Sequence, residues 1–141
     1  MDNTLYLVSK LKNLSDKFIS DSLKKLGIDE MVPSHGRILI ELFQNKSLSM
    51  SEIAIKIEKD PSTVTTLVKK LINLGYVEIS KDIVDKRTNK VILTKKGNDL
   101  EHELKMISSK MYNQQYLNIE KEDILIFRKV LEEMIDNFKI Q

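Results

Sequence analysis

The chain has 141 residues, of which 41% are hydrophobic, 31% are charged and none is cysteine. This composition indicates a globular, helix-rich chain of one domain, and it excludes disulfide scaffolds, thiolate metal sites and cysteine redox chemistry. The longest apolar runs have four residues, and the N-terminus lacks the basic-then-apolar pattern of a signal peptide. We therefore expect a cytoplasmic protein without a membrane span.

The formal net charge of +2 hides an uneven distribution along the chain. Residues 46–97 carry eleven basic and six acidic side chains, whereas residues 1–45 are neutral and residues 98–141 are net acidic. A basic middle third indicates a surface for an anionic partner such as nucleic acid. Charge also fluctuates along any chain, so the motifs have to support this interpretation.

Both ends of the chain predict long helices. Apolar residues recur there at spacings of three and four, and the predicted helices cover residues 4–26, 34–45, 96–116 and 120–139. The roughly fifty residues in the middle of the chain cannot cover the apolar stripes of the first helix and the last two helices. We therefore expect residues 1–30 and 98–141 to form a homodimer interface, with a self-contained monomeric bundle as the alternative.

The middle of the chain predicts two short helices followed by two strands. Ser49 and Glu52 have the spacing of a capping box, and Asp60-Pro61 is a start signal for a second helix over 61–74. The expected buried residues of these helices are Ile53, Ala54, Ile57, Val64, Leu67, Val68 and Leu71. Alternating residues around 77–80 and 91–93 then predict two strands joined by the polar loop Lys81–Lys90, and Thr94 to Gly97 opens the next helix.

This order of elements is that of a winged helix-turn-helix, so we predict a mainly α fold with a small β-hairpin wing and a core over residues 34–97. The outward face of helix 61–74 carries hydrogen-bond donors and no acid: Ser62, Thr63, Thr65, Thr66, Lys69 and Lys70. A helix fits the major groove, its first turns meet base edges, and its N-terminus favours a nearby phosphate. An ordinary surface helix is the alternative, although such a helix usually carries some Asp or Glu on this face.

The loop between the strands carries three further candidate DNA-binding residues, Asp85, Arg87 and Lys90. An arginine at the tip of a hairpin can enter a narrow minor groove, and Asp85 can pair with Arg87 and fix its direction. The alternative is a solvated turn with a surface ion pair of little energetic value.

Residues 49–97 resemble the multiple-antibiotic-resistance regulator (MarR) family of bacterial transcription factors. The motifs that carry the resemblance are Ser51-Glu52-Ile53-Ala54, Ser62-Thr63-Val64-Thr65-x-Leu67-Val68-x-x-Leu71, Gly75-Tyr76-Val77, Asp85-Lys86-Arg87 and Leu93-Thr94-x-x-Gly97. The resemblance implies an obligate homodimer that binds double-stranded DNA at a pseudo-palindrome and responds to a small aromatic effector. It also places Thr63, Thr65, Lys69 and Lys70 in the groove and Asp85 and Arg87 in the wing.

One residue departs from the family pattern. The family often has an arginine, which binds guanine with two hydrogen bonds, where this chain has Thr66. The methyl group of a threonine suits thymine instead, so we predict an AT-rich operator. A repressor released by its ligand is the function that these features favour.

Other kinds of site have little support in the sequence. No phosphate loop, dinucleotide-binding turn or hydrolase motif is present, so we expect no catalytic residue, metal or cofactor. His102 is expected to be a solvated helical residue, and His35, Tyr6, Phe18 or Tyr112 belong either to an effector cleft or to the core. A winged-helix protein-interaction module that does not bind DNA is the alternative function.

Overall fold

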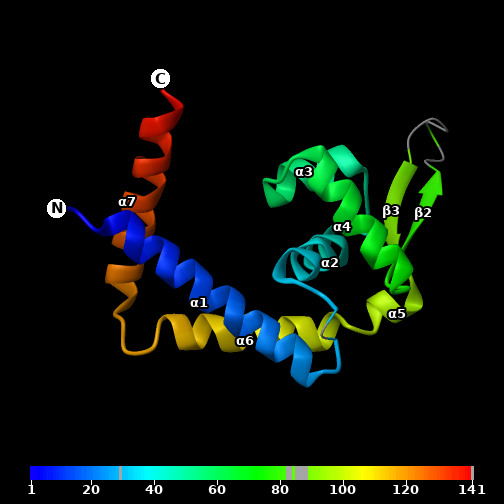
Figure 1. Cartoon of the computed structure of the whole chain (residues 1–141), viewed down its shortest axis with the longest axis horizontal. Helices are drawn as coiled ribbons and strands as arrows, with labels where there is room; N and C mark the ends of the chain where they lie inside the picture. The colour runs from blue at the N-terminus through cyan, green and yellow to red at the C-terminus, as the bar shows by residue number, and fades with distance from the viewer. Residues whose placement is uncertain (29, 82–83, 85–88, 141) are drawn as a thin grey trace.

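The structure is a computed structural model that describes residues 1–28, 30–81, 84 and 89–140. In the described part of the chain, seven helices and three short strands follow one another (Figure 1). Their bounds are α1 Thr4–Lys25, α2 Pro33–Asn45, β1 Ser47–Leu48, α3 Met50–Ile57, α4 Pro61–Asn73, β2 Val77–Lys81, β3 Asn89–Leu93, α5 Lys95–Asn98, α6 Glu101–Gln115 and α7 Lys121–Lys139. The fold is therefore mainly α with a small antiparallel sheet, as the sequence predicted.

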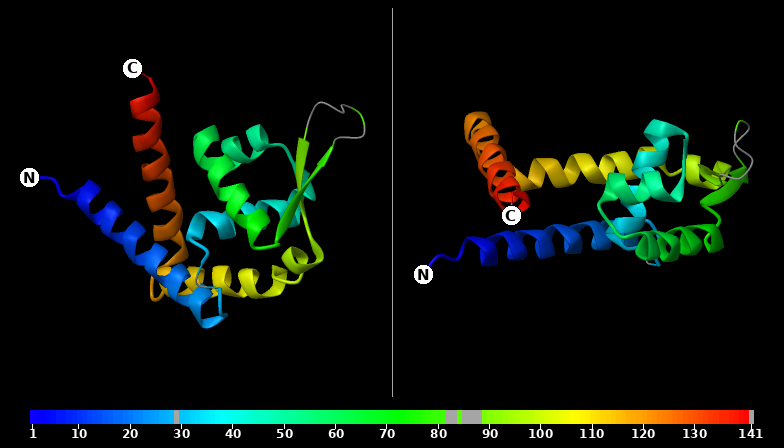
Figure 2. Two further views of the ribbon diagram at one scale, coloured as in Figure 1. Left: turned by 45° about the vertical axis from the view of Figure 1, so that its right-hand side comes forward. Right: turned by 90° about the horizontal axis from the view of Figure 1, so that it is seen from above.

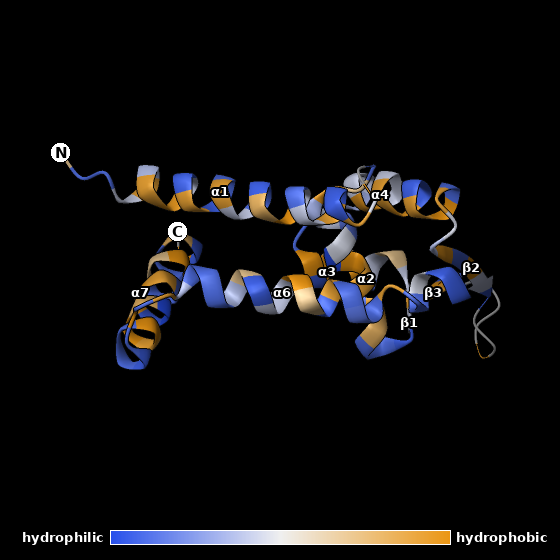
Figure 3. Ribbon diagram, turned by 90° about the horizontal axis from the view of Figure 1, so that it is seen from below, coloured by the Kyte–Doolittle hydropathy of each residue, from blue (hydrophilic) through white to orange (hydrophobic). Residues whose placement is uncertain are grey.

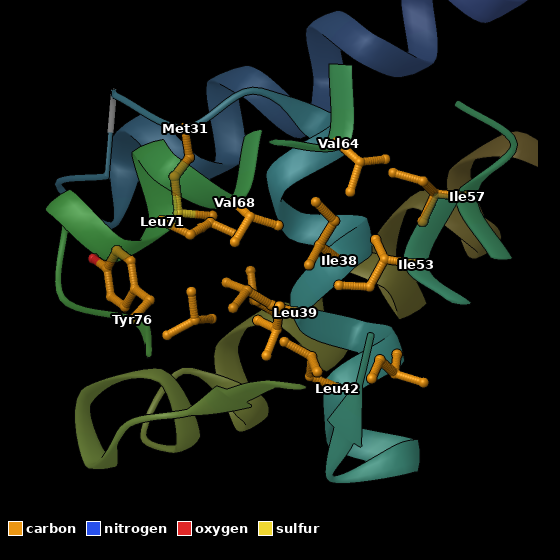
Figure 4. Close-up of a cluster of buried hydrophobic side chains, with 14 of the residues drawn as sticks. Met31, Ile38, Leu39, Leu42, Ile53, Ile57, Val64, Val68, Leu71 and Tyr76 are labelled. Atoms are coloured by element: carbon orange, nitrogen blue, oxygen red, sulfur yellow. The ribbon is translucent and has the colours of Figure 1, made fainter. Parts of the chain in front are cut away.

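The core lies where α2, α3 and α4 meet (Figure 4). Helix α2 contributes Ile38, Leu39 and Leu42, which have no exposed surface and lie between the other two helices and the sheet. The residues predicted to be buried on α3 and α4 are buried, except that Leu67 is only half-buried. Burying such side chains supplies most of the free energy that holds the two short helices in place.

The sheet has the strand order β1-β3-β2, with both pairs antiparallel. Strands β2 and β3 form the predicted hairpin, and pairing reaches Lys81 opposite Asn89, so the strands extend into the predicted loop. Strand β1, which pairs Leu48 with Val91, was not predicted, because two residues are too short to show an alternating pattern. It attaches the wing to the segment between α2 and α3.

The prediction of a single helix over 96–116 is wrong in one respect, because this segment is divided into α5 and α6. Thr94 caps α5 by accepting a hydrogen bond from the Gly97 backbone N–H at 3.1 Å. The Leu100 N–H then bonds to the Gly97 carbonyl three residues back, which forms a tight turn where the helix would otherwise continue. The wing end of this segment is thereby separated from the long α6.

The long helices extend away from the core, and α1 and α6 run side by side (Figure 2). Helix α7 departs from the end of α6, and its one buried side chain is Ile124, in its first turn. Hydrophobic residues recur along α1 and α7 (Figure 3), and many of their side chains are exposed. Among the described residues, no helix is both long enough and apolar enough to cross a membrane.

Candidate nucleic-acid interface

Helix α4 is positioned by a cap at its start and by an apolar stripe along one side. The Asp60 carboxylate accepts a hydrogen bond from the Thr63 backbone N–H at 2.9 Å, and Pro61 occupies the first helical position. Val64, Val68 and Leu71 anchor the helix on α2 and α3. The opposite side of the helix therefore has to face outward.

The structure brings the six residues predicted on α4 together on this outward side. Ser62, Thr65, Thr66 and Lys69 are exposed, whereas Thr63 and Lys70 are half-buried. Their hydroxyl groups all donate within the protein. Ser62 Oγ donates to Asp60 at 2.6 Å, Thr63 Oγ1 to Asp60 at 3.1 Å, Thr65 Oγ1 to the Pro61 carbonyl at 2.9 Å and Thr66 Oγ1 to the Ser62 carbonyl at 3.2 Å.

The expectation of a phosphate at the N-terminus of this helix is not favoured by the structure. The Ser62 hydroxyl and then the Thr63 N–H hold the pKa of Asp60 at about 2, so its carboxylate is charged at neutral pH. This charge occupies the positive end of the helix and repels a second anion there. The cap was predicted from the sequence, but its competition with a bound phosphate was not.

One of the predicted wing residues, Lys90, has a defined contact in the structure. Lys90 Nζ lies 2.7 Å from Glu52 Oε1, and the Lys90 side chain is 23% exposed. Lys90 is the main reason that the pKa of Glu52 falls to about 2, followed by the Ser49 backbone N–H. Asp85 and Arg87 lie outside the described residues, so their DNA contacts, like that of Lys90, stay predictions.

Sequence reasoning missed the pairs that connect these elements. Glu52 was assigned to a capping box, which the structure confirms at 3.1 and 3.2 Å, but it also ties the wing to the start of α3. At the other end of α4, Lys96 Nζ donates to the Leu74 carbonyl at 2.7 Å and lies over the Tyr76 ring. The sequence carries no signal for either pair, because the partners are 38 and 22 residues apart.

A cavity of about 430 Å³ lies between the long helices and the helix-turn-helix. Residues of α1, α2 and α6 line it together with Ile57 at the end of α3 and with Glu58 and Lys59 from the turn between α3 and α4. None of the four aromatic or histidine residues considered for an effector cleft is part of this lining. His35 is buried and its Nδ1 accepts a hydrogen bond from the Val32 N–H at 2.9 Å, so it caps α2; burial lowers its pKa.

Known proteins share this architecture. Residues 32–88 match the MarR family. Over 99 residues the chain is 26% identical to the HTH-type transcriptional regulator SarZ of Staphylococcus saprophyticus. The matched segment is 70% of this chain and 66% of that relative, which is slightly under two thirds of its length.

Solved structures are similar over almost the whole chain. A MarR protein from Peptoclostridium difficile superposes with a TM-score of 0.84, at 23% identity and with 99% of this chain and 93% of that one covered. The C80S mutant of MarR from Escherichia coli, complexed with operator DNA, superposes with a TM-score of 0.81 at 17% identity, covering 94% and 96% of the two chains. These likenesses establish the winged helix-turn-helix fold, and the sequence matches show that this chain is similar to the MarR family over residues 32–88.

Proposed function

We propose that this chain is a DNA-binding transcriptional regulator that acts as a homodimeric, ligand-responsive repressor at a pseudo-palindromic, AT-rich operator. The observation that carries the proposal is the outward face of α4, which is rich in hydroxyls and lysines and lies beside a β-hairpin wing. This is the arrangement in which a helix enters the major groove while a hairpin lies along the neighbouring backbone. The DNA-reading residues of the proposal are the nine predicted ones on α4 and in the wing.

The homodimer is supported by the surface that a single copy leaves uncovered. On α7 alone, Leu125, Ile126, Phe127, Val130, Ile135 and Phe138 are between 45% and 73% exposed. Helix α1 adds Leu5, Tyr6, Leu7, Leu11 and Leu14. Monomers rarely expose apolar residues along two whole helices. In the proposal, residues 1–30 and 98–141 form the dimer, the core over 34–97 reads DNA, and the two α4 helices lie about 34 Å apart, one turn of B-DNA.

The effector is proposed to bind in the cavity between α1, α2, α6 and the α3–α4 turn. Its lining mixes apolar side chains such as Ile19, Leu104 and Ile107 with charged side chains of both signs: Lys12, Arg37, Lys59, Asp16 and Glu58. A small aromatic molecule with polar substituents fits this combination. A ligand that prefers one spacing of the α4 helices then shifts the dimer away from the DNA-binding arrangement.

The test is selection of bound fragments from genomic DNA by the purified protein at two salt concentrations. We expect a pseudo-palindromic site whose binding constant falls steeply with salt, because each neutralised phosphate contributes a logarithmic slope of about −0.9. Lys69→Ala should reduce the slope or relax the sequence preference, whereas Lys129→Ala, a change of another exposed lysine on α7, should do neither. Failure to enrich any sequence would refute DNA reading by α4 and favour a protein-interaction module.

A further inference from the structure

The four hydroxyl groups on the first two turns of α4 have lost the freedom to act as donors. Each hydroxyl has a single proton, and all four protons are directed to Asp60 or to backbone carbonyls, at 2.6 to 3.2 Å. What these groups present outward is oxygen lone pairs, together with the methyl groups of the threonines. These hydroxyl groups can therefore accept hydrogen bonds, and the threonine methyl groups can make apolar contacts, but the hydroxyl protons are already engaged within the protein.

Asp60 holds two of these hydroxyls in this orientation. One carboxylate oxygen receives the Ser62 hydroxyl and the Thr63 N–H, and the other receives the Thr63 hydroxyl. Thr65 and Thr66 are oriented instead by the carbonyls one turn before them. The donors on this side of the helix, Lys69 and Lys70, come one to two turns later, so acceptors and donors are separated along the helix axis.

Base pairs differ in what they present to such a surface. In the major groove adenine offers its N6 amino group as a donor and thymine offers a methyl group, whereas guanine offers only the acceptors N7 and O6. Cytosine also has an amino donor, but it has no methyl group beside it. A surface of acceptors and methyl groups is thus complementary to A·T pairs. Opposite guanine, the same acceptors would face the two acceptors N7 and O6 and would repel them.

We propose that the first two turns of α4 select A·T pairs by accepting hydrogen bonds from adenine N6 and contacting thymine methyl groups, with Asp60 as the positioning residue. This inference rests on the proposed function, because it requires α4 to lie in the major groove. It goes further by assigning the atoms that are read and the direction of the hydrogen bonds. Adenine N7, which can only accept, is not used by this part of the helix.

The test uses the selected operator with single-atom changes in the bases that face α4. Replacing adenine by purine removes the N6 amino group, and replacing thymine by uracil removes the methyl group. Each change should weaken binding roughly three- to tenfold, the range for one neutral hydrogen bond or one methyl contact. Replacing adenine by 7-deazaadenine removes N7 and should leave binding unchanged. The same changes outside the α4 contacts control for altered duplex stability.

Protein variants separate the two kinds of contact. Thr65→Val and Thr66→Val keep the methyl groups but remove the oxygens, so at the bases that face these two residues they should abolish the penalty for purine and retain the penalty for uracil. Thr65→Ser and Thr66→Ser should do the reverse. Asp60→Asn removes the charge that orients Ser62 and Thr63, so it should reduce the penalty for purine at the bases facing these two residues and leave it unchanged at those facing Thr65 and Thr66. Circular dichroism checks that the fold is retained.

The outcomes distinguish this inference from the proposed function. A penalty for 7-deazaadenine with none for purine would mean that the hydroxyls donate, and it would overturn the inference while leaving DNA binding intact. Selection of a guanine-rich sequence opposite the first two turns of α4 would overturn it as well. If the wild-type protein bound no duplex, both the proposed function and this inference would fail.

Discussion

The clearest perturbation of the proposed dimer is the double change Phe127→Ala and Phe138→Ala on α7. The two side chains lie on the stripe that begins with the buried Ile124, and they are 45% and 73% exposed in the single chain. We expect a second copy of the chain to cover them. The double variant should therefore dissociate into monomers at concentrations where the wild-type protein is a dimer.

The size of the effect follows from the exposed fractions. Complete burial of a phenylalanine is worth about 1.5–3 kcal/mol, so covering the remaining exposed parts is worth about 1 kcal/mol for Phe127 and about 1.5 kcal/mol for Phe138. A twofold interface contains each residue twice, which brings the loss to roughly 5 kcal/mol per dimer. Since about 1.4 kcal/mol is a factor of ten, the dimer dissociation constant should rise roughly 10³- to 10⁴-fold.

Sedimentation equilibrium over a range of protein concentrations measures this constant directly. The control is the pair of changes Lys129→Ala and Glu133→Ala on the same helix, where both side chains are more than 60% exposed and lie 3.9 Å apart as a weak ion pair. The control should remain dimeric. If the phenylalanine variant had the same dissociation constant as the wild type while keeping its helix content, α7 would not be the dimer interface.

Three further predictions concern the winged core. Gly97→Ala should destabilise the protein by about 1–3 kcal/mol, because the new Cβ would lie 2.1 Å from a backbone carbonyl, whereas Gly36→Ala, with open space around it, should be neutral or stabilising in chemical denaturation. The pKa of Glu52 is lowered from 4.5 to about 2, so its stabilising effect is complete above pH 4.5 and is lost as pH falls toward 2; unfolding measured against pH should lose most of this dependence in Lys90→Met. Arg87→Ala should weaken duplex binding in a filter or anisotropy assay without lowering the melting temperature, and unchanged binding would refute the wing assignment.

Local signals were enough to predict most of the winged core. Asp60-Pro61 and the apolar repeat through Leu71 located α4 to within one residue at its end, because caps and helical periodicity act over one or two turns. The capping box of Ser49 and Glu52 was confirmed for the same reason. The candidate DNA-reading residues followed from this placement, since burial of one stripe decides what faces outward.

Features that depend on distant partners could not be predicted. Strand β1 exists because Leu48 pairs with Val91, and neither residue indicates this pairing locally. The ion pair of Glu52 with Lys90 joins residues 38 apart and gives Lys90 a structural contact beside its predicted role in DNA binding. The direction of the hydroxyl protons on α4 likewise needed the positions of the acceptors one turn earlier.

The position of the cavity explains how a ligand could control a DNA-reading helix that it does not touch. Glu58 and Lys59 line the cavity and directly precede Asp60, the cap of α4, while the opposite wall belongs to the long helices α1 and α6. A ligand bound there contacts both the start of the reading helix and the proposed dimer scaffold. To move a dimer from 1% to 99% released, it must bind the released arrangement about 10⁴-fold more tightly, or about 5.5 kcal/mol. A cavity of about 430 Å³ with both apolar and charged lining is large enough for such a difference, because a change in spacing between its two walls alters many contacts at once.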